Sequence, residues 1–250
     1  MKATLSLSAF FAVALAAPSS HDGFLNPRST EKTSINWSGA VVQGKNITAV
    51  TATFPVLDTK IPAVNETGKH AYQGTAWIGI DGYNKTVCPE GLWQAGVMTS
   101  HHALTGEIWF QAWYEWYPDP PVFVDIGDIS AGDIINVALN APTPTQASVV
   151  LENQSTGRGF NQTVNLTRPL CLSSAEWIVE RAYTLSGLVG LIDFGTETIS
   201  DITYTVGDEL HTSIPDDVTI INIINDEDNN VQQTSTEVSG NTIKVTYLGS

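Results

Sequence analysis

Residues 107–119 read EIWFQAWYEWYPD, and their pattern determines how the rest of the chain is interpreted. Successive residues alternate between two faces, which is typical of a β-strand. One face is apolar and consists of Ile108, Phe110, Ala112, Tyr114 and Trp116. The other mixes acidic, amide and aromatic side chains, namely Glu107, Trp109, Gln111, Trp113, Glu115 and Tyr117.

At about 3.3 Å per residue the strand would run for about 35 Å before Pro118 ends it. We expect the apolar face in the core and the mixed face along a cleft, because exposed tryptophan surface is costly unless something covers it. The plainer alternative is a central strand whose tryptophans only fill gaps in packing.

Short segments of similar character continue along the chain from Asn36, separated by Gly, Pro, Asn and Asp. The expected strands cover residues 37–42, 47–54, 75–81, 92–98, 123–126, 134–139, 147–151, 176–180, 203–206, 218–224 and 242–248. Helical periodicity is nearly absent. This density of short strands predicts an all-β sandwich or barrel. We expect one domain over residues 34–250, since no internal repeat or linker divides it.

The first 33 residues differ from the rest. Residues 1–16 have the layout of a secretory signal peptide, with Lys2 before an apolar run and Ala14-Leu15-Ala16 as the cleavage site. Residues 17–33 are polar and lack periodicity, which indicates a short pro-segment or flexible arm. No later stretch has the roughly 20 apolar residues of a membrane helix. We therefore expect a secreted, extracellular protein.

Secretion explains two further features. The chain has two cysteines, Cys88 and Cys171, and in an oxidising compartment an isolated pair most simply forms a disulfide. Closing a loop of about 80 residues would stabilise the fold by about 4 kcal/mol in the chain-entropy model. Seven N-x-S/T sequons predict a glycoprotein, and they begin at Asn36, Asn46, Asn65, Asn84, Asn153, Asn161 and Asn165. Of these, Asn36 fits glycosylation least, because Trp37 follows it and is expected to be buried.

The composition is acidic, with 11 Lys and Arg against 26 Asp and Glu and a formal net charge of -15. Such a surface repels nucleic acid and anionic membranes, so we expect neither as a partner. Near pH 3 to 4 many carboxylates are protonated, which suits a protein that works in acid, although many extracellular proteins are simply acidic. Because no Cys or His cluster has ligand spacing, we expect no metal site and no cofactor. We expect a monomer.

Alternation in the strands around residues 107–119 brings polar and aromatic side chains to one face. In residues 75–81, Trp77 and Asp81 share a face with Gly79 between them, opposite an apolar set. The same count places Gln94 opposite Trp93 in residues 92–98, and Glu180 opposite Trp177 in residues 176–180. We expect one concave face that presents Trp77, Asp81, Gln94, Glu115 and Glu180. The expected disulfide would join the neighbourhoods of Gln94 and Glu180.

Five blocks of the chain, in this order and spacing, resemble the glutamic peptidases (eqolisins), acid endopeptidases secreted mainly by fungi. The blocks are NWSGAV at 36–41, TAWIGIDG at 75–82, LWQAGV at 92–97, AWYEWYP at 112–118 and AEWIVE at 175–180. The resemblance implies a sandwich of two large antiparallel sheets, similar in architecture to legume lectins and glucanases. It also implies polypeptide substrates, and we expect cleavage that pepstatin does not inhibit.

Matched block by block, the family's catalytic pair falls on Gln94 and Glu180, and its supporting residues fall on Trp37, Trp77, Asp81 and Glu115. Peptide hydrolysis needs a group that takes a proton from water, one that protonates the leaving nitrogen, and a donor to the developing oxyanion. Glu180 can act as base and then as acid, and the Gln94 amide can supply the donor. One departure concerns Met98, which stands where the family often has an aspartate.

Two other functions fit parts of the pattern. A retaining glycosidase could use Glu176 and Glu180, whose Cα atoms would lie about 13 Å apart on one strand face. Ile178 is a poor substitute for the aspartate that such enzymes usually place between the two glutamates. A non-catalytic lectin or other module that binds carbohydrate or protein could instead use indoles as stacking surfaces, with Trp77, Trp109 and Trp113 as candidates.

Overall fold

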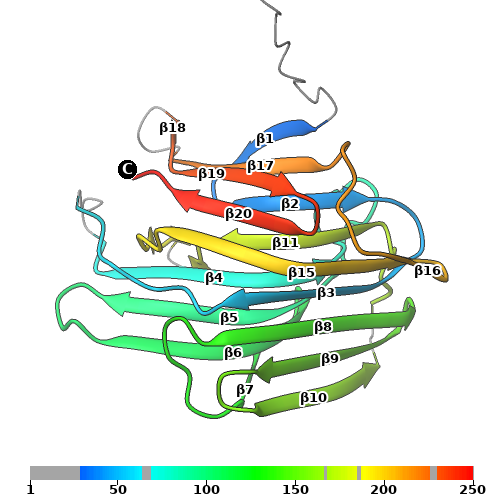
Figure 1. The fold of residues 1–250 in the computed structure, drawn as a ribbon, viewed down its shortest axis with the longest axis horizontal. Helices are drawn as coiled ribbons and strands as arrows, with labels where there is room; N and C mark the ends of the chain where they lie inside the picture. Colours follow the sequence, from blue (N-terminus) through cyan, green and yellow to red (C-terminus); the bar gives the residue numbers. More distant parts are fainter. Residues whose placement is uncertain (1–28, 64–68, 166–167, 185–186, 226–229, 250) are drawn as a thin grey trace, which may run out of the picture.

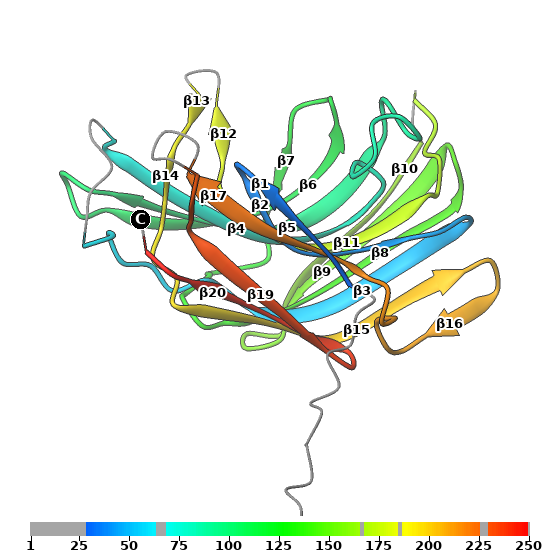
Figure 2. The same ribbon diagram turned by 90° about the horizontal axis from the view of Figure 1, so that it is seen from above.

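The computed structural model describes residues 29–63, 69–165, 168–184, 187–225 and 230–249. The expected signal peptide, most of the expected arm at 17–33 and the sequon at Asn65 lie outside these ranges. The described residues form two large β-sheets packed face to face and contain no helix, so none that could span a membrane (Figures 1 and 2). This confirms the predicted all-β sandwich.

The larger sheet carries the strands of the predicted cleft. Its neighbours pair antiparallel except β1 with β17 and β14 with β4, which are parallel. Its order is β1 (Thr30–Ser34), β17 (Thr219–Asn225), β2 (Trp37–Gln43), β11 (Ser174–Glu180), β4 (Ala71–Ile80), β5 (Leu92–His102), β6 (Ile108–Tyr117) and β7 (Val122–Val124). β14 (Gly190–Leu191) adds to β4, and β18 (Val231–Gln232) adds to β17.

The smaller sheet covers one face of the larger one (Figure 2). Its order is β10 (Arg158–Asn165), β9 (Gln146–Asn153), β8 (Ile134–Thr143), β3 (Ile47–Pro55), β15 (Thr196–Val206), β20 (Thr242–Tyr247) and β19 (Thr234–Ser239), with β16 (Glu209–His211) beside β15. A separate short hairpin pairs β12 (Tyr183–Thr184) with β13 (Gly187–Leu188). In Figure 2 this hairpin and β7, the edge strand of the larger sheet, lie on the side away from the smaller sheet.

The apolar core lies between the sheets and includes the predicted inner face of β6. Ala112 and Trp116 are buried there, and Tyr114 packs against the same cluster. Two buried indoles of the larger sheet donate their N–H to backbone oxygens of the smaller one, Trp93 to Ser148 at 3.3 Å and Trp177 to Thr51 at 3.2 Å. These hydrogen bonds remove the cost of burying an indole N–H and fix how the two sheets meet.

Each segment expected to be a strand overlaps an observed one, but several strands were not expected. β1 begins at Thr30, four residues before the expected start of the domain at residue 34, and its side chains are mostly exposed. β10, at the edge of the smaller sheet, is exposed along most of its length. Backbone pairing is the main support of β1, and in β10 only Phe160 and Val164 pack against the core, so neither strand has an apolar alternation strong enough for a sequence pattern to detect.

Candidate active site

A cleft of about 530 Å³ lies on the face of the larger sheet that points away from the core. The residues that alternate with its lining, such as Trp93 beside Gln94 and Val179 beside Glu180, are buried between the sheets. The predicted division into a core face and a cleft face is therefore correct for Gln94, Glu115 and Glu180, which all line the cleft. The cleft is lined by Asn36, Trp37, Thr75, Gly82, Lys85, Leu92, Gln94, Met98, Trp113, Glu115, Tyr117, Pro121, Phe123, Glu180 and Ala182.

Glu180 is the last residue of β11, and hydrogen bonds hold both of its carboxyl oxygens. Trp77 Nε1 donates to Oε2 at 2.8 Å, and Asn36 Nδ2 donates to Oε1 at 3.0 Å. Burial raises the pKa of Glu180 to about 7, and the nearby Glu115 carboxylate adds to the rise. The Trp37, Trp77 and Asn36 donors oppose it because they favour the ionised form. The carboxyl is thus fixed in position and protonated in acid.

The elements around Glu180 explain why these donors point at it. Trp37 on β2 lies directly across from Glu180 in the β2–β11 register, and its ring meets that of Trp77 edge-on with centroids 5.0 Å apart. Ser34 Oγ donates to Asn36 Oδ1 at 3.0 Å, which orients the amide so that its nitrogen faces Glu180. The Arg181 backbone N–H donates to the Asn36 carbonyl oxygen at 2.8 Å and holds the Asn36 backbone in place.

Gln94 on β5 is paired across the strands with Glu115 on β6. Its Nε2 donates to Glu115 Oε2, while its Oε1 is buried and has no hydrogen-bond partner among the described residues. Burial raises the pKa of Glu115, the hydrogen bond from Gln94 opposes this, and Asp119 raises the pKa further. The contact with Glu115 orients the amide, and the second N–H and the carbonyl oxygen keep hydrogen-bonding capacity that this contact does not use.

Trp77 belongs to β4, the strand between those of Gln94 and Glu180, and is not among the residues that line the cleft. It is fully buried and pairs with Gly96 of β5, two residues from Gln94, and with Ile178 of β11, two residues from Glu180. A Cβ at Gly96 would lie 2.6 Å from Trp77 Cβ and still closer to the backbone oxygen of Ala76. The glycine therefore makes room for the indole that connects the two halves of the site.

Asp81 does not line the cleft, although the sequence places it on that face. Its carboxylate accepts hydrogen bonds from the backbone N–H of Cys171, Leu172 and Ser173 and from Ser173 Oγ, all between 2.6 and 2.9 Å. The alternation does not extend to it because β4 ends at Ile80 and Asp81 has a φ of 70°. Asp81 instead fixes the loop that leads into β11, the strand that ends at Glu180.

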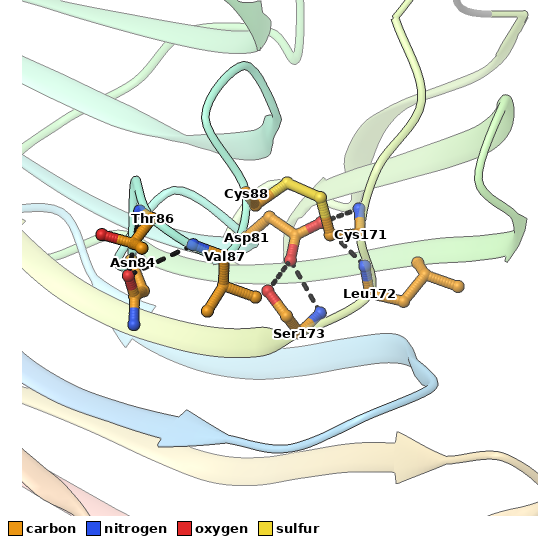
Figure 3. Close-up of a disulfide and its surroundings, with 8 residues drawn as sticks. All are labelled: Asp81, Asn84, Thr86, Val87, Cys88, Cys171, Leu172 and Ser173. Carbon is orange, nitrogen blue, oxygen red and sulfur yellow. Dashed lines mark hydrogen bonds between the residues drawn. A yellow bond between two sulfur atoms is a disulfide. The ribbon is translucent and has the colours of Figure 1, made fainter.

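The expected disulfide is formed between Cys88 and Cys171, 83 residues apart, with Cα atoms separated by 5.7 Å (Figure 3). It lies beside the loop that Asp81 holds. Asp81, Cys88 and Cys171 are, among the described residues, the one group of three or more acidic, His or Cys side chains whose donor atoms lie close enough together for a metal ion. Their donor atoms are already engaged in the disulfide and the hydrogen bonds of Asp81.

The glycosidase alternative depends on Glu176, which the structure places outside the cleft lining. Its side chain is fully buried, and burial is the main cause of a pKa well above the usual value, with the Ser174 hydroxyl opposing the shift. Buried Ile178 lies between Glu176 and Glu180 on the same strand face. A sealed carboxyl cannot reach a substrate as the second member of a catalytic pair.

Sequence reasoning missed several residues of the site. Asn36 precedes the first strand of the cleft, where no alternation applies, and the one signal was its place beside Trp37 in a resembling block. Thr75 accepts a hydrogen bond from Trp113 Nε1 at 3.2 Å and donates to the Val97 carbonyl at 3.1 Å. Phe123 and Lys85 reach the cleft from β7 and from the loop after β4.

The sequence profile described as the Peptidase A4 family matches residues 35–247, which is most of the chain. The chain belongs to the Peptidase A4 family. Aspergillopepsin-2 of Aspergillus niger is 35% identical over 240 residues, which cover 90% of this chain and 81% of that protein. Scytalidopepsin B of Scytalidium lignicola is 33% identical over 147 residues, covering 58% and 51%.

Solved structures of family members have the same fold. Scytalido-glutamic peptidase with a transition-state analogue inhibitor superposes with a TM-score of 0.71 at 29% identity, covering 85% of this chain and 98% of that one. Aspergilloglutamic peptidase from Aspergillus niger gives 0.63 at 35% identity, covering 71% and 99%. The resemblance to glutamic peptidases drawn from the five sequence blocks is confirmed, and this A4-family chain is a peptidase, hence a hydrolase.

Proposed function

We propose that the chain is a secreted acid endopeptidase that cleaves polypeptides through Glu180 and Gln94 and is not inhibited by pepstatin. The observation that carries the proposal is that both side chains line one cleft, with the Glu180 carboxyl held by Trp77 and Asn36. Membership of the A4 family supports the activity, and the relatives named above are peptidases. The cleft offers the acid, the base and the oxyanion donor that amide hydrolysis requires.

In the first step water adds to the carbonyl carbon of the scissile bond. One oxygen of protonated Glu180 accepts a proton from the attacking water while the other gives its own proton to the carbonyl oxygen, so the carboxyl stays neutral. Gln94 Nε2 donates to the same carbonyl oxygen as charge develops on it, and Gln94 Oε1 accepts a hydrogen bond from the water. The product is a tetrahedral diol.

In the second step the bond between carbon and nitrogen breaks. Glu180 gives its proton to the leaving nitrogen and takes one from a hydroxyl of the diol, which yields a carboxylic acid and an amine. The enzyme returns to its starting state, with Glu180 protonated.

The pKa of Glu180 determines which form enters the reaction. From the sequence alone we expect Glu180 to act first as a base, which requires its ionised form. With a pKa of about 7, the ionised fraction at pH 4 is roughly one part in a thousand. We therefore assign the activity to the protonated form, and expect kcat/KM to fall as the pH rises through about 7.

The test is hydrolysis of a denatured protein between about pH 2 and 8 in the presence of pepstatin, which suppresses contaminating aspartic peptidases. We expect Glu180→Gln to lower kcat/KM by about 10²–10⁴-fold, and Gln94→Ala by about 10²–10³-fold. Glu176→Gln is the matched control, because it makes the same change on the same face of β11 outside the cleft lining. It should retain activity close to that of the wild type.

Two results would overturn the proposal. One is a folded, processed wild-type protein that cleaves nothing across this pH range. The other is a Glu180→Gln variant that keeps wild-type activity while its near-ultraviolet circular dichroism shows an intact fold. Secretion with removal of residues 1–16 is a separate part of the proposal, and N-terminal sequencing of the protein from culture medium tests it.

A further inference from the structure

One side of the cleft is apolar, although the protein as a whole is strongly acidic. Met98 on β5 is partly buried against a cluster on the cleft face that includes Trp77 and Trp113. Phe123 on β7 pairs across the strands with Trp113 and is 51% exposed, which is high for a large aromatic side chain. An exposed ring at the border of a cleft, next to a buried indole and a thioether, provides a surface that an apolar group can cover.

The strand register places this surface beside the proposed reaction centre. Glu180 pairs with Thr75, and Thr75 pairs with Met98, so these three side chains form one row across β11, β4 and β5. Two strand spacings separate the Cα atoms of Glu180 and Met98 by about 10 Å. A side chain that flanks a carbonyl group held between Glu180 and Gln94 can therefore reach Met98.

The side chains around Met98 do not favour the binding of a charged substrate group. Met98 has uncharged neighbours in its row, Thr75 on β4 and Gln111 on β6. Glu115 accepts the hydrogen bond from Gln94, and burial raises the pKa of Glu115, which weakens its attraction for a cation in acid. Lys85 lies with its Nζ 4.7 Å from the centre of the Tyr117 ring.

We propose that Met98, Trp113 and Phe123 form a subsite for a large apolar side chain next to the scissile bond, and that Met98 determines this specificity. The proposal rests on the peptidase function proposed above and names its substrate class, namely polypeptides with Leu, Met, Phe or a similar residue flanking the cleaved bond. An aspartate here would replace an apolar wall by a group that must stay hydrated or find a partner.

The expected size of the effect follows from apolar burial. Adding or removing a methylene group in an apolar pocket changes kcat/KM by about 10–200-fold. A peptide with Leu at the flanking position should therefore be cleaved at least tenfold faster than one with Ala, and faster still than one with Asp or Lys.

The test uses peptides that differ only at the two residues flanking the cleaved bond, after mass spectrometry of a digested protein has located preferred sites. Wild type is compared with Met98→Asp and Met98→Leu at about pH 4. Met98→Asp should lower kcat/KM for the Leu and Phe peptides by more than tenfold and reduce their advantage over the Lys peptide. Met98→Leu should preserve the ranking because it keeps the apolar surface.

The matched control is Val150→Asp, which adds the same charge at a 42% exposed position on β9 of the other sheet. It should leave the ranking of peptides unchanged. A Met98→Asp variant that is folded, active and has the wild-type ranking at both flanking positions would overturn the proposal.

A binding measurement tests the subsite independently of the proposed hydrolysis. Glu180→Gln, with or without Met98→Asp, can be titrated with the Leu and Lys peptides while tryptophan fluorescence is recorded, and no cleavage is needed. Tighter binding of the Leu peptide that is lost with Met98→Asp supports the subsite even if the wild type cleaves nothing. Equal binding of both peptides by Glu180→Gln overturns the subsite even if the wild type is an active peptidase.

Discussion

At the scale of single residues, the ionisation of Glu180 depends on opposing effects. Burial and the charge of Glu115 favour the protonated carboxyl, whereas the indole and amide donors favour the carboxylate. The pKa of about 7 is the balance of these effects. The donors therefore do more than hold the side chain in position, because they also determine up to which pH it keeps its proton.

Replacing Trp77 by phenylalanine should shift the pH dependence of the enzyme. The change keeps most of the ring volume and removes the Nε1–H that donates to Glu180 Oε2 at 2.8 Å. Since this donor lowers the pKa of Glu180, its loss should raise that pKa, and the fall of kcat/KM at high pH should move to higher pH. A pH profile of kcat/KM from about pH 3 to 9 measures the shift. An unchanged profile, or one displaced to lower pH, would contradict the assignment of the protonated form as active.

At the scale of strands, glycines decide how closely side chains can lie on the cleft face. Gly96→Ala would place its Cβ against the backbone oxygen of Ala76 and 2.6 Å from Trp77 Cβ. Because backbone cannot yield easily, we expect a loss of about 2–4 kcal/mol in the free energy of unfolding and a Tm lower by several degrees, measured by calorimetry. Gly44→Ala is the control, since its nearest atom would be a flexible carbon of Ile47 at 3.4 Å. Equal Tm values for the two variants would show that the close approach at Gly96 has no energetic importance.

The same scale shows what the sequence could predict. Alternation located Gln94, Glu115 and Glu180 on one face because each lies within a regular strand with one face in the core. It failed at Asp81, one residue beyond the end of β4, where a positive φ turns the side chain toward another loop. Asn36 could not be found in this way because its role depends on a contact with a residue 144 positions away. Pairing between distant segments, such as β1 with β17, leaves no local pattern.

At the scale of the whole molecule, the net charge and the buried carboxyls both make the folded protein more stable in acid than at neutral pH. The formal net charge of -15 at pH 7 means that carboxylates repel one another at neutral pH. Glu176 and Glu197 are 0% and 2% exposed, and burial is the largest cause of a raised pKa at both. These carboxyls lie outside the cleft lining, so their protonation concerns the stability of the fold and not the reaction.

The free energy of unfolding should therefore be highest in acid and fall as the pH rises. A carboxyl with a higher pKa in the folded chain binds its proton more tightly there, so its contribution is complete below the ordinary pKa of 4.5 and is lost toward the raised value. Each such group can contribute a slope of up to about 1.4 kcal/mol per pH unit above pH 4.5. Urea unfolding between about pH 3 and 8 measures this slope for the wild type and for Glu176→Gln with Glu197→Gln. The double variant cannot titrate at either position and should lose stability less steeply between pH 5 and 8. If its slope equals that of the wild type, the two carboxyls are not the origin of the pH dependence, and repulsion between surface carboxylates would have to account for it.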